Sequence, residues 1–172
     1  MRLACPLAAG LLLLLAAAPA TAGEIHSRYA TLSYDRVELL LRFNSKVRLD
    51  GGFFSFGSSS AHVDDEVRKK LDQFAARVQE ILDMRPKGFK FKVVLLPNRR
   101  RVDEIYAEQY RLRKGFIAFF SPKTNTIYIS VDDVKSRVFA HELAHAVIHH
   151  YFNRAPPTKI HELLAQYVES QL

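Results

Sequence analysis

Few residues in this sequence can cross-link the chain or interrupt a helix. The 172 residues include one cysteine, Cys5, and no tryptophan. A single thiol cannot form an intramolecular disulfide, so the fold must depend on its hydrophobic core. Proline and glycine number seven each, and neither occurs between residues 134 and 152, where a helix can therefore run uninterrupted.

A long apolar run lies at the N-terminus. Residues Met1–Ala22 combine a positive charge at Arg2, an apolar stretch and an A-x-A cleavage pattern, which together are typical of a secretory signal peptide. Cleavage would remove the only cysteine and leave residues 23–172 in the periplasm or outside the cell. An uncleaved membrane anchor is the alternative, and Pro19 and the small residues beside it disfavour that interpretation.

Composition argues against a disordered chain. The sequence is 48% apolar, which is enough to build the core of one domain over residues 23–172, and no internal repeat is visible. Its net charge is +7, and basic residues gather at Arg99–Arg101, Arg111, Arg113 and Lys114. A solvated helix face is the simplest explanation. Attraction to an acidic substrate or an anionic envelope polymer is the alternative, and we expect no nucleic-acid partner for an exported chain.

The most informative motif is H-E-x-x-H, at residues 141–145. Four residues advance a helix by about 400°, so the rings of His141 and His145 point about 40° apart and lie about 6 Å apart along the axis. One metal ion can therefore bind both rings. Glu142 points about 100° from His141, a direction that suits a general base acting on water rather than a third ligand. The mixed nitrogen and oxygen ligands indicate zinc.

The residues around the motif predict a helix over Val134–Phe152. Apolar residues recur there at helical spacing, and Asp132 and Asp133 suit its first turn. Asn153 and the pair Pro156–Pro157 then end it.

A catalytic zinc site usually has three protein ligands, so a further donor is needed. The metzincin pattern would place Gly and His where this sequence has Ile148 and Tyr151, and it is therefore absent. A Glu on a following helix is the other arrangement, and Glu162 lies in a second helical segment after the two prolines. Ala165, with Ala144 opposite, would let the two helices approach closely. We therefore predict that His141, His145 and Glu162 bind the metal.

Neighbouring donors fit the site less well. His161 points about 100° from Glu162, which predicts a position at the rim if Leu163, Leu164 and Tyr167 face the core. Glu169 lies about 10 Å further along the same face, as a surface carboxylate or a hydrogen-bond partner of a ligand. His149 and His150, near the end of the first helix, are expected to be solvated there.

These motifs, over roughly residues 115–168, resemble the gluzincin branch of zinc metallopeptidases, in particular the small bacterial peptidase MA-like proteins. The resemblance implies an α+β zincin-like fold, a small mixed sheet packed on helices. It implies that zinc is bound by His141, His145 and Glu162, with Glu142 as general base and proton shuttle. In such proteins a Tyr or His also stabilises the oxyanion. Five residues could do so here: Tyr110, Tyr128, Tyr151, Tyr167 and His26.

The segment before the motif predicts a β-hairpin, with strands over residues 116–120 and 126–130. By the same resemblance, an edge strand at Ala118–Phe120 would pair with an extended peptide or protein substrate. A structural hairpin is the simpler alternative.

Earlier segments predict a helix over Asp64–Met84, a strand over Phe89–Leu96 and a helix over Arg101–Arg113. Residues Asp35–Phe43 fit either a helix or a strand, and Gly51–Ser60 reads as a Gly/Ser-rich connection.

Two functions follow from these observations. The first is an exported zinc-dependent metallopeptidase that hydrolyses peptide bonds. The second is a catalytically silent zinc-containing binding protein of the cell envelope with a zincin fold. Glu142 favours the first, because a purely structural zinc site does not need a general base.

Overall fold

A computed structural model describes residues 22–49 and 60–172 of the chain. The signal-peptide prediction and most of the Gly51–Ser60 connection therefore lie outside the described residues. The described part is an α+β fold with a five-stranded mixed sheet, in the order β1-β2-β3-β5-β4. The strands are β1 (Gly23–His26), β2 (Ala30–Tyr34), β3 (Phe91–Leu96), β4 (Ala118–Ser121) and β5 (Thr126–Ser130).

The centre of the sheet is parallel and both of its edges are antiparallel. Strand β3 runs parallel to β2 and to β5, whereas β1 pairs with β2, and β4 with β5, in antiparallel hairpins. The predicted hairpin before the H-E-x-x-H motif is confirmed, with Phe119 opposite Tyr128. Strand β4 is thus the edge of the sheet within the described ranges.

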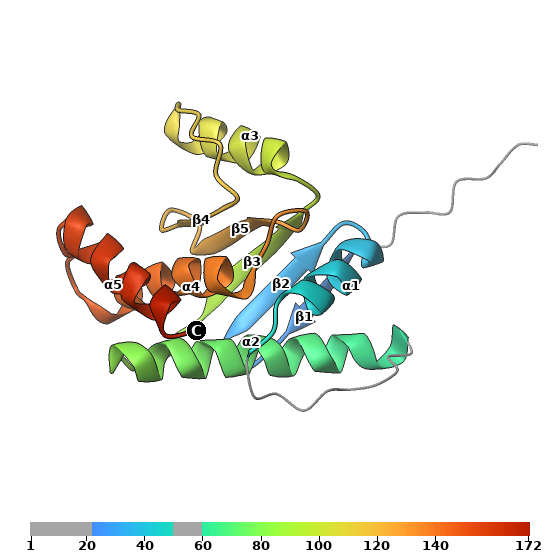
Figure 1. The fold of residues 1–172 in the computed structure, drawn as a ribbon, viewed down its shortest axis with the longest axis horizontal. Coiled ribbons are helices and arrows are strands. Elements are labelled where there is room, and N and C mark those ends of the chain that lie inside the picture. Colours follow the sequence, from blue (N-terminus) through green and yellow to red (C-terminus); the bar gives the residue numbers. More distant parts are fainter. Residues whose placement is uncertain (1–21, 50–59) are drawn as a thin grey trace, which may run out of the picture.

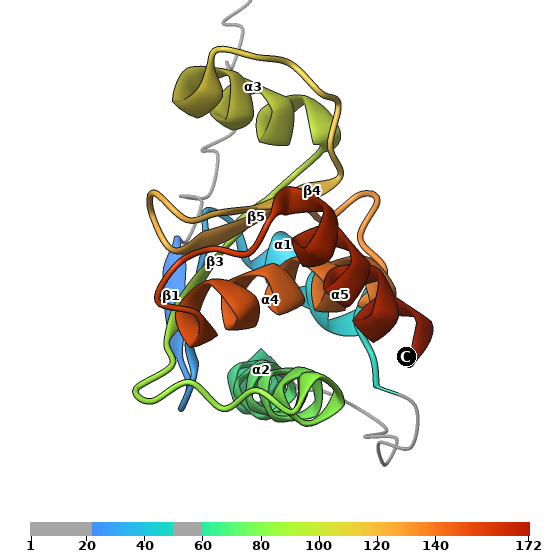
Figure 2. The ribbon, with the colours of Figure 1, turned by 90° about the vertical axis from the view of Figure 1, so that its left-hand side faces the viewer.

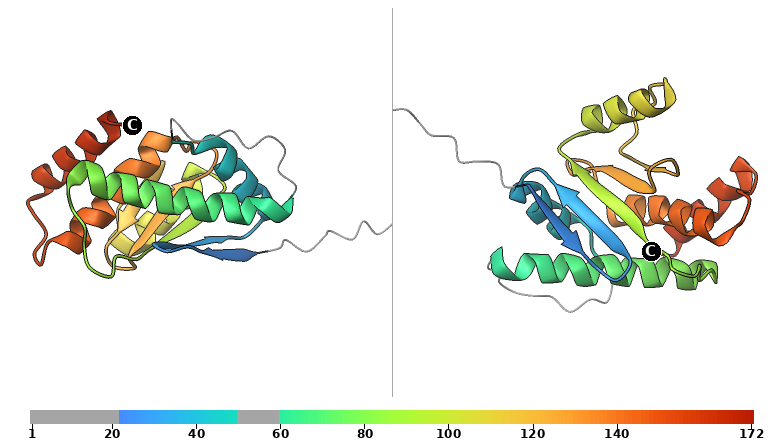
Figure 3. Two further views of the ribbon diagram at one scale, coloured as in Figure 1. Left: turned by 90° about the horizontal axis from the view of Figure 1, so that it is seen from below. Right: turned by 180° about the vertical axis from the view of Figure 1, so that it is seen from behind.

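The described residues form five helices around the sheet. They are α1 (Val37–Lys46), α2 (Ser60–Leu82), α3 (Arg99–Tyr110), α4 (Ser136–Tyr151) and α5 (Thr158–Ser170). Helices α1 and α4 pack on one face, and α2 forms an outer layer beneath them, as the view from below shows (Figure 3). Helix α5 packs along α4, while α3 covers the opposite face (Figures 1 and 2).

The main core lies between the sheet and α1, α2 and α4. The ring of Phe139 on α4 contacts Phe43 on α1 and Phe74 on α2, with ring centroids 5.5 and 5.2 Å apart. All three side chains are fully buried. Helix α4 is thereby fixed by aromatic packing two residues before His141, which is how the core positions the motif.

A smaller apolar cluster lies under α3, on the other face of the sheet. Phe119, Leu96 and Val102 are its buried members. Because side chains alternate between the faces of a strand, Phe119 belongs to this cluster while Ala118 belongs to the main core. The short strand β4 therefore contributes to both cores.

The predicted α3 and α4 helices begin at different residues from those expected. Helix α3 starts at Arg99 rather than Arg101, because the Asn98 side chain caps it by accepting from the Arg101 N–H at 3.2 Å. Helix α4 starts at Ser136, so the prediction that Asp132 and Asp133 lie in its first turn is wrong. Instead, Asp133 accepts a hydrogen bond from the Ser130 hydroxyl at 2.8 Å, in a turn that precedes the helix.

Candidate metal centre

The two histidines of the motif lie side by side on α4. Leu143 and Ala144, between them, are buried in the core, so His141 and His145 face outward toward α5 while remaining largely shielded, with 19% and 13% of their side chains exposed. Their Nε2 atoms are 3.2 Å apart. The helical spacing thus brings the two nitrogens close enough to bind one metal ion, as the sequence predicted.

Helix α5 adds a carboxylate to this pair. The Glu162 oxygens lie 3.6 Å from His141 Nε2 and 3.5 Å from His145 Nε2. All three donor atoms fall within 4.8 Å of one another. We call these three residues the metal triad. Ala165 and Val168, fully buried on α5, allow the close approach of the helices that this geometry requires.

The spacing of the triad fits a zinc ion. Zinc bonds to histidine nitrogen and carboxylate oxygen are about 2.0–2.2 Å long, so neighbouring corners of a zinc tetrahedron lie about 3.3–3.6 Å apart. The two Nε2 atoms, 3.2 Å apart, match that edge length, whereas the 3.6 and 3.5 Å separations join His141 to Oε2 and His145 to Oε1 of Glu162, so the carboxylate lies within reach of an ion between the rings. A tetrahedral site with three protein ligands has one further position for water or substrate.

Hydrogen bonds on the far side of each ring orient the histidines. His141 Nδ1 donates to the Glu169 carboxylate at 3.2 Å, which places the proton of a neutral ring on Nδ1 and leaves a lone pair on Nε2. His145 Nδ1 lies 2.7 Å from His161 Nδ1, and donation to His161 likewise leaves the His145 Nε2 lone pair toward the triad. Two lone pairs at 3.2 Å repel each other unless a cation lies between them.

Electrostatics keep His145 neutral and therefore able to bind a metal. Burial lowers the pKa of His145 to about 3, and the neighbouring His141 and His161 rings lower it as well. Burial also lowers the pKa of His161, against the opposing effect of Glu162. Only a neutral imidazole offers a lone pair to a metal, so these shifts favour binding.

Glu142 lies beside the triad at the edge of the sheet. Its Oε2 accepts a hydrogen bond from the Phe120 N–H on β4 at 2.8 Å. Burial raises the pKa of the Glu142 carboxyl to about 7, and the Glu162 and Glu169 carboxylates contribute in the same direction, while the Phe120 N–H opposes them. A carboxyl with a pKa near neutrality is suited to accept and then release a proton.

His161 is the residue that the sequence analysis placed wrongly. The expectation that it lies at the rim assumed that Leu163, Leu164 and Tyr167 face the core. Leu164 does pack against the core, but 61% of Leu163 and 50% of Tyr167 are exposed. Helix α5 instead buries Ala165 and Val168, which share a stripe with His161. The His161 ring therefore stacks on His145, with centroids 4.9 Å apart. Because Ala165 lies four residues after His161 on the same helix face, the sequence could have predicted that His161 faces α4.

Of the two other histidines near the end of α4, His149 is less solvated than predicted, whereas His150 is exposed as predicted. His149 is half-buried, and its ring lies 5.7 Å from that of Phe120. His150 is exposed, yet its Nε2 contacts Asn125 Oδ1 at 2.9 Å and its ring contacts Phe89 at 5.3 Å. Neither belongs to the metal triad.

The five candidates for oxyanion stabilisation lie in different parts of the structure. Tyr110 and Tyr128 pack in the cluster under α3, on the opposite face of the sheet. His26 lies on β1, at the far edge of the sheet from β4. Tyr151 and Tyr167 are on the helices of the triad, with about half of each side chain exposed, 48% and 50%.

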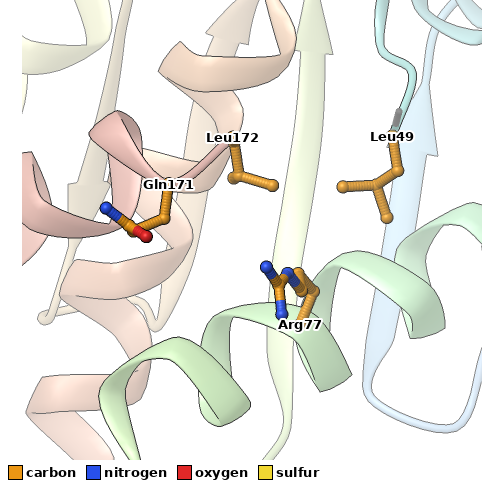
Figure 4. A pocket seen from close by; sticks show the side chains of 4 residues that line it. All are labelled: Leu49, Arg77, Gln171 and Leu172. Atoms are coloured by element: carbon orange, nitrogen blue, oxygen red, sulfur yellow. The ribbon is translucent and has the colours of Figure 1, made fainter. Parts of the chain in front are cut away.

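Two surface hollows lie away from the triad. One is lined by Leu49, Arg77, Gln171 and Leu172, beside α2 and the end of α5 (Figure 4). The other lies at the β1–β2 turn and the start of β3. Neither contains a metal-binding group comparable to the triad. The candidate site is therefore identified by its ligating residues and not by a hollow in the surface. Within the described ranges, no helix is both long and apolar enough to cross a membrane.

Comparison with known proteins found no matching family model, curated protein or solved structure. The structure thus supports a candidate metal site on an α+β fold, and the arguments for its function depend on its geometry.

Proposed function

We propose that this protein is an exported zinc-dependent metallopeptidase of gluzincin type. The observation that carries the proposal is the metal triad, whose three donor atoms lie within 4.8 Å of one another, with Glu142 next to His141 on α4. A bound zinc ion would act as a Lewis acid and lower the pKa of water. His141, His145 and Glu162 would hold it, oriented by Glu169 and His161.

Glu142 is the proposed general base. Its carboxylate would take a proton from the attacking water and pass it to the amide nitrogen as the peptide bond breaks. The raised pKa supports both steps, because a group that titrates near pH 7 exchanges protons readily at neutral pH. The Phe120 N–H, 2.8 Å from Oε2, holds the carboxylate in place.

An extended peptide is the proposed substrate, paired with the outer edge of β4 at Ala118–Phe120. Phe119 pairs with Tyr128, and the Ser130 N–H donates to Ile117 O at 2.8 Å, so the N–H and C=O groups of Ala118 point away from β5. The Phe120 N–H points the same way and reaches Glu142. A substrate strand on this edge would therefore pass directly by the proposed base.

We place the protein in the periplasm or outside the cell, because residues Met1–Ala22 have the pattern of a signal peptide. A catalytically silent zinc-binding protein of the envelope is the competing proposal. The position of Glu142 favours the peptidase, because its carboxylate is oriented by the Phe120 N–H next to the triad and a zinc site that only stabilises structure does not need a general base.

Peptide cleavage tests the proposal. Zinc-loaded protein should hydrolyse members of an unbiased peptide library, and Glu142→Gln should reduce the rate by about 10²–10⁴-fold, which is the usual contribution of a general base. The variant should still bind zinc. If wild-type protein binds zinc and cleaves no peptide, the binding-protein function replaces the peptidase.

A further inference from the structure

A basic loop leads directly into the proposed substrate-binding strand. Residues 111–116, which connect α3 to β4, are exposed without interruption. They include three cationic side chains: Arg111, Arg113 and Lys114. Exposed apolar side chains accompany them, with 48% of Leu112 and 36% of Phe116 accessible. The proposed mechanism uses none of these residues.

Asp103 on α3 fixes the conformation of this loop. Its Oδ1 accepts hydrogen bonds from the N–H groups of Lys114 and Gly115, both at 2.9 Å. Gly115 has a φ of 64°, which a glycine adopts without strain. The Phe116 ring packs on Tyr106, with centroids 4.9 Å apart. A loop that is already ordered loses little conformational entropy when a ligand binds.

The loop joins the N-terminal end of β4, and its contacts with Asp103 and Tyr106 hold it on the α3 side of the strand edge. A strand advances about 3.3 Å per residue, so Ala118 is about 7 Å along the edge from Phe120, where the base is bound. A peptide paired with β4 would therefore reach the loop about three residues from the cleaved bond. This holds for one side of the bond only, because the loop precedes the N-terminal end of β4.

The charges around the proposed cleft are distributed unevenly. Residues 99–123 contain seven Lys and Arg but three Asp and Glu, in a chain whose net charge is +7. The metal triad, by contrast, is accompanied by the carboxylates of Glu142 and Glu169. An acidic substrate side chain would be attracted at the loop, whereas at the triad the charge of a bound zinc ion would offset part of the charge of these carboxylates.

We infer that loop 111–117 is a specificity element that recognises acidic residues of a peptide, about three to five positions from the cleaved bond and on one side of it. The inference rests on the proposed peptidase function. Lys114 and Arg113 are the main contacts. Asp103 fixes the backbone at Lys114 and Gly115, and the Arg113 guanidinium lies 3.7 Å from the same carboxylate while 71% of the Arg113 side chain stays exposed. The acidic segment is part of a peptide rather than of a free polyanion, since the loop is continuous with a strand edge that can pair with a peptide backbone.

Matched peptides test this inference. Each has the same cleavable centre and carries either two Glu or two Gln, three and four residues from the cleaved bond, on one side or the other. We expect kcat/KM to be about fivefold higher for the Glu peptide on one side only, as two exposed ion pairs would give. The preference should disappear in about 0.5 M salt, which screens exposed charges.

A paired set of variants locates the effect. Arg113→Gln combined with Lys114→Gln should abolish the preference for Glu. Lys69→Gln combined with Arg77→Gln removes the same charge from exposed positions on α2, in the layer beneath α4, and should leave the preference intact. Circular dichroism and zinc content verify that each variant is folded.

Several results would contradict the inference. Equal cleavage of Glu and Gln peptides would overturn it while leaving the peptidase proposal in place, and a preference on both sides would indicate general attraction of polyanions. If no peptide is cleaved, the peptidase proposal fails, and fluorescence anisotropy of the same peptides decides between the remaining outcomes. Tighter binding of the Glu peptide that depends on Arg113 and Lys114 would support loop recognition, and equal binding would overturn it.

Discussion

At the scale of single residues, the candidate site depends on which nitrogen of each histidine carries a proton. Glu169 and His161 each contact the Nδ1 of one triad histidine, at 3.2 and 2.7 Å. Both contacts direct an Nε2 lone pair toward Glu162. The orientation of the two rings is thus set by residues of α5 that do not belong to the metal triad.

We predict that Glu169→Ala weakens zinc binding about tenfold, because loss of a carboxylate that orients a ligating histidine typically costs 10–100-fold in affinity. Glu169→Gln should weaken it less, since the amide oxygen can still accept from His141 Nδ1. Competition with a fluorescent zinc chelator measures both values. Glu108→Ala, at an exposed carboxylate on α3, is the control and should have no effect. Equal affinity in Glu169→Ala and wild type would refute the orienting role.

A second prediction at this scale concerns pH. In the metal-free folded protein His145 titrates at about 3, whereas in the unfolded chain its pKa is near 6.5. Between these values the unfolded chain binds more protons, so the contribution of His145 to stability is present above pH 6.5 and is lost as pH falls toward 3. From pH 7 to pH 4, wild-type protein should lose about 3 kcal/mol more unfolding free energy than His145→Gln.

Urea denaturation of both proteins at the two pH values, with chelator present, measures this difference. Carboxylate titrations affect wild type and variant alike, so they cancel in the comparison. Identical losses of stability would mean that His145 is protonated as easily in the folded state as in the unfolded chain.

At the scale of secondary-structure elements, the site depends on the rotation of α5 about its axis. Ala165 and Val168 are fully buried, while Leu163 and Tyr167 face outward. This rotation turns Glu162 and Glu169 toward α4. The size of the side chain at position 165 therefore controls how closely the carboxylates approach the histidines.

We predict that Ala165→Leu destabilises the protein by about 1–3 kcal/mol, the usual cost of overpacking a filled interior. It should also weaken zinc binding, because α5 must move away from α4. Leu163→Ala, at the most exposed large apolar residue of the same helix, should change stability by less than about 0.5 kcal/mol and leave zinc affinity unchanged. Thermal unfolding and zinc titration measure both variants, and unchanged zinc affinity in Ala165→Leu would show that the triad tolerates displacement of α5.

The elements that the sequence predicted well are those with local signals. Helices α4 and α5 and the β4–β5 hairpin have clear periodicity and are bounded by prolines or turn residues. The ambiguous segment 35–43 forms α1 from Val37 onward, since Leu39, Leu40 and Phe43 share a helical face that the core buries. The short strand β1 was not predicted, because its four residues are defined by backbone pairing with β2 rather than by a pattern of their own.

At the scale of the whole molecule, the features that the sequence alone could not predict are those that depend on contacts between residues far apart in the chain. The four candidate site residues, His141, Glu142, His145 and Glu162, were predicted from their spacing along two helices. Their partners His161 and Phe120 were not, because the contact between Phe120 and Glu142 depends on how the sheet edge packs against α4. The pairing of β3 with both β2 and β5 likewise joins segments far apart in the chain.

The most direct test of this account is a calorimetric titration of zinc into the chelator-treated protein, repeated with His145→Ala and Glu162→Ala. We predict one zinc ion bound tightly per wild-type chain, no tight binding in His145→Ala and clearly weaker binding in Glu162→Ala. Absence of zinc binding by folded wild-type protein, or equal binding by wild type and both variants, would contradict the assignment of the metal triad and the peptidase function built on it.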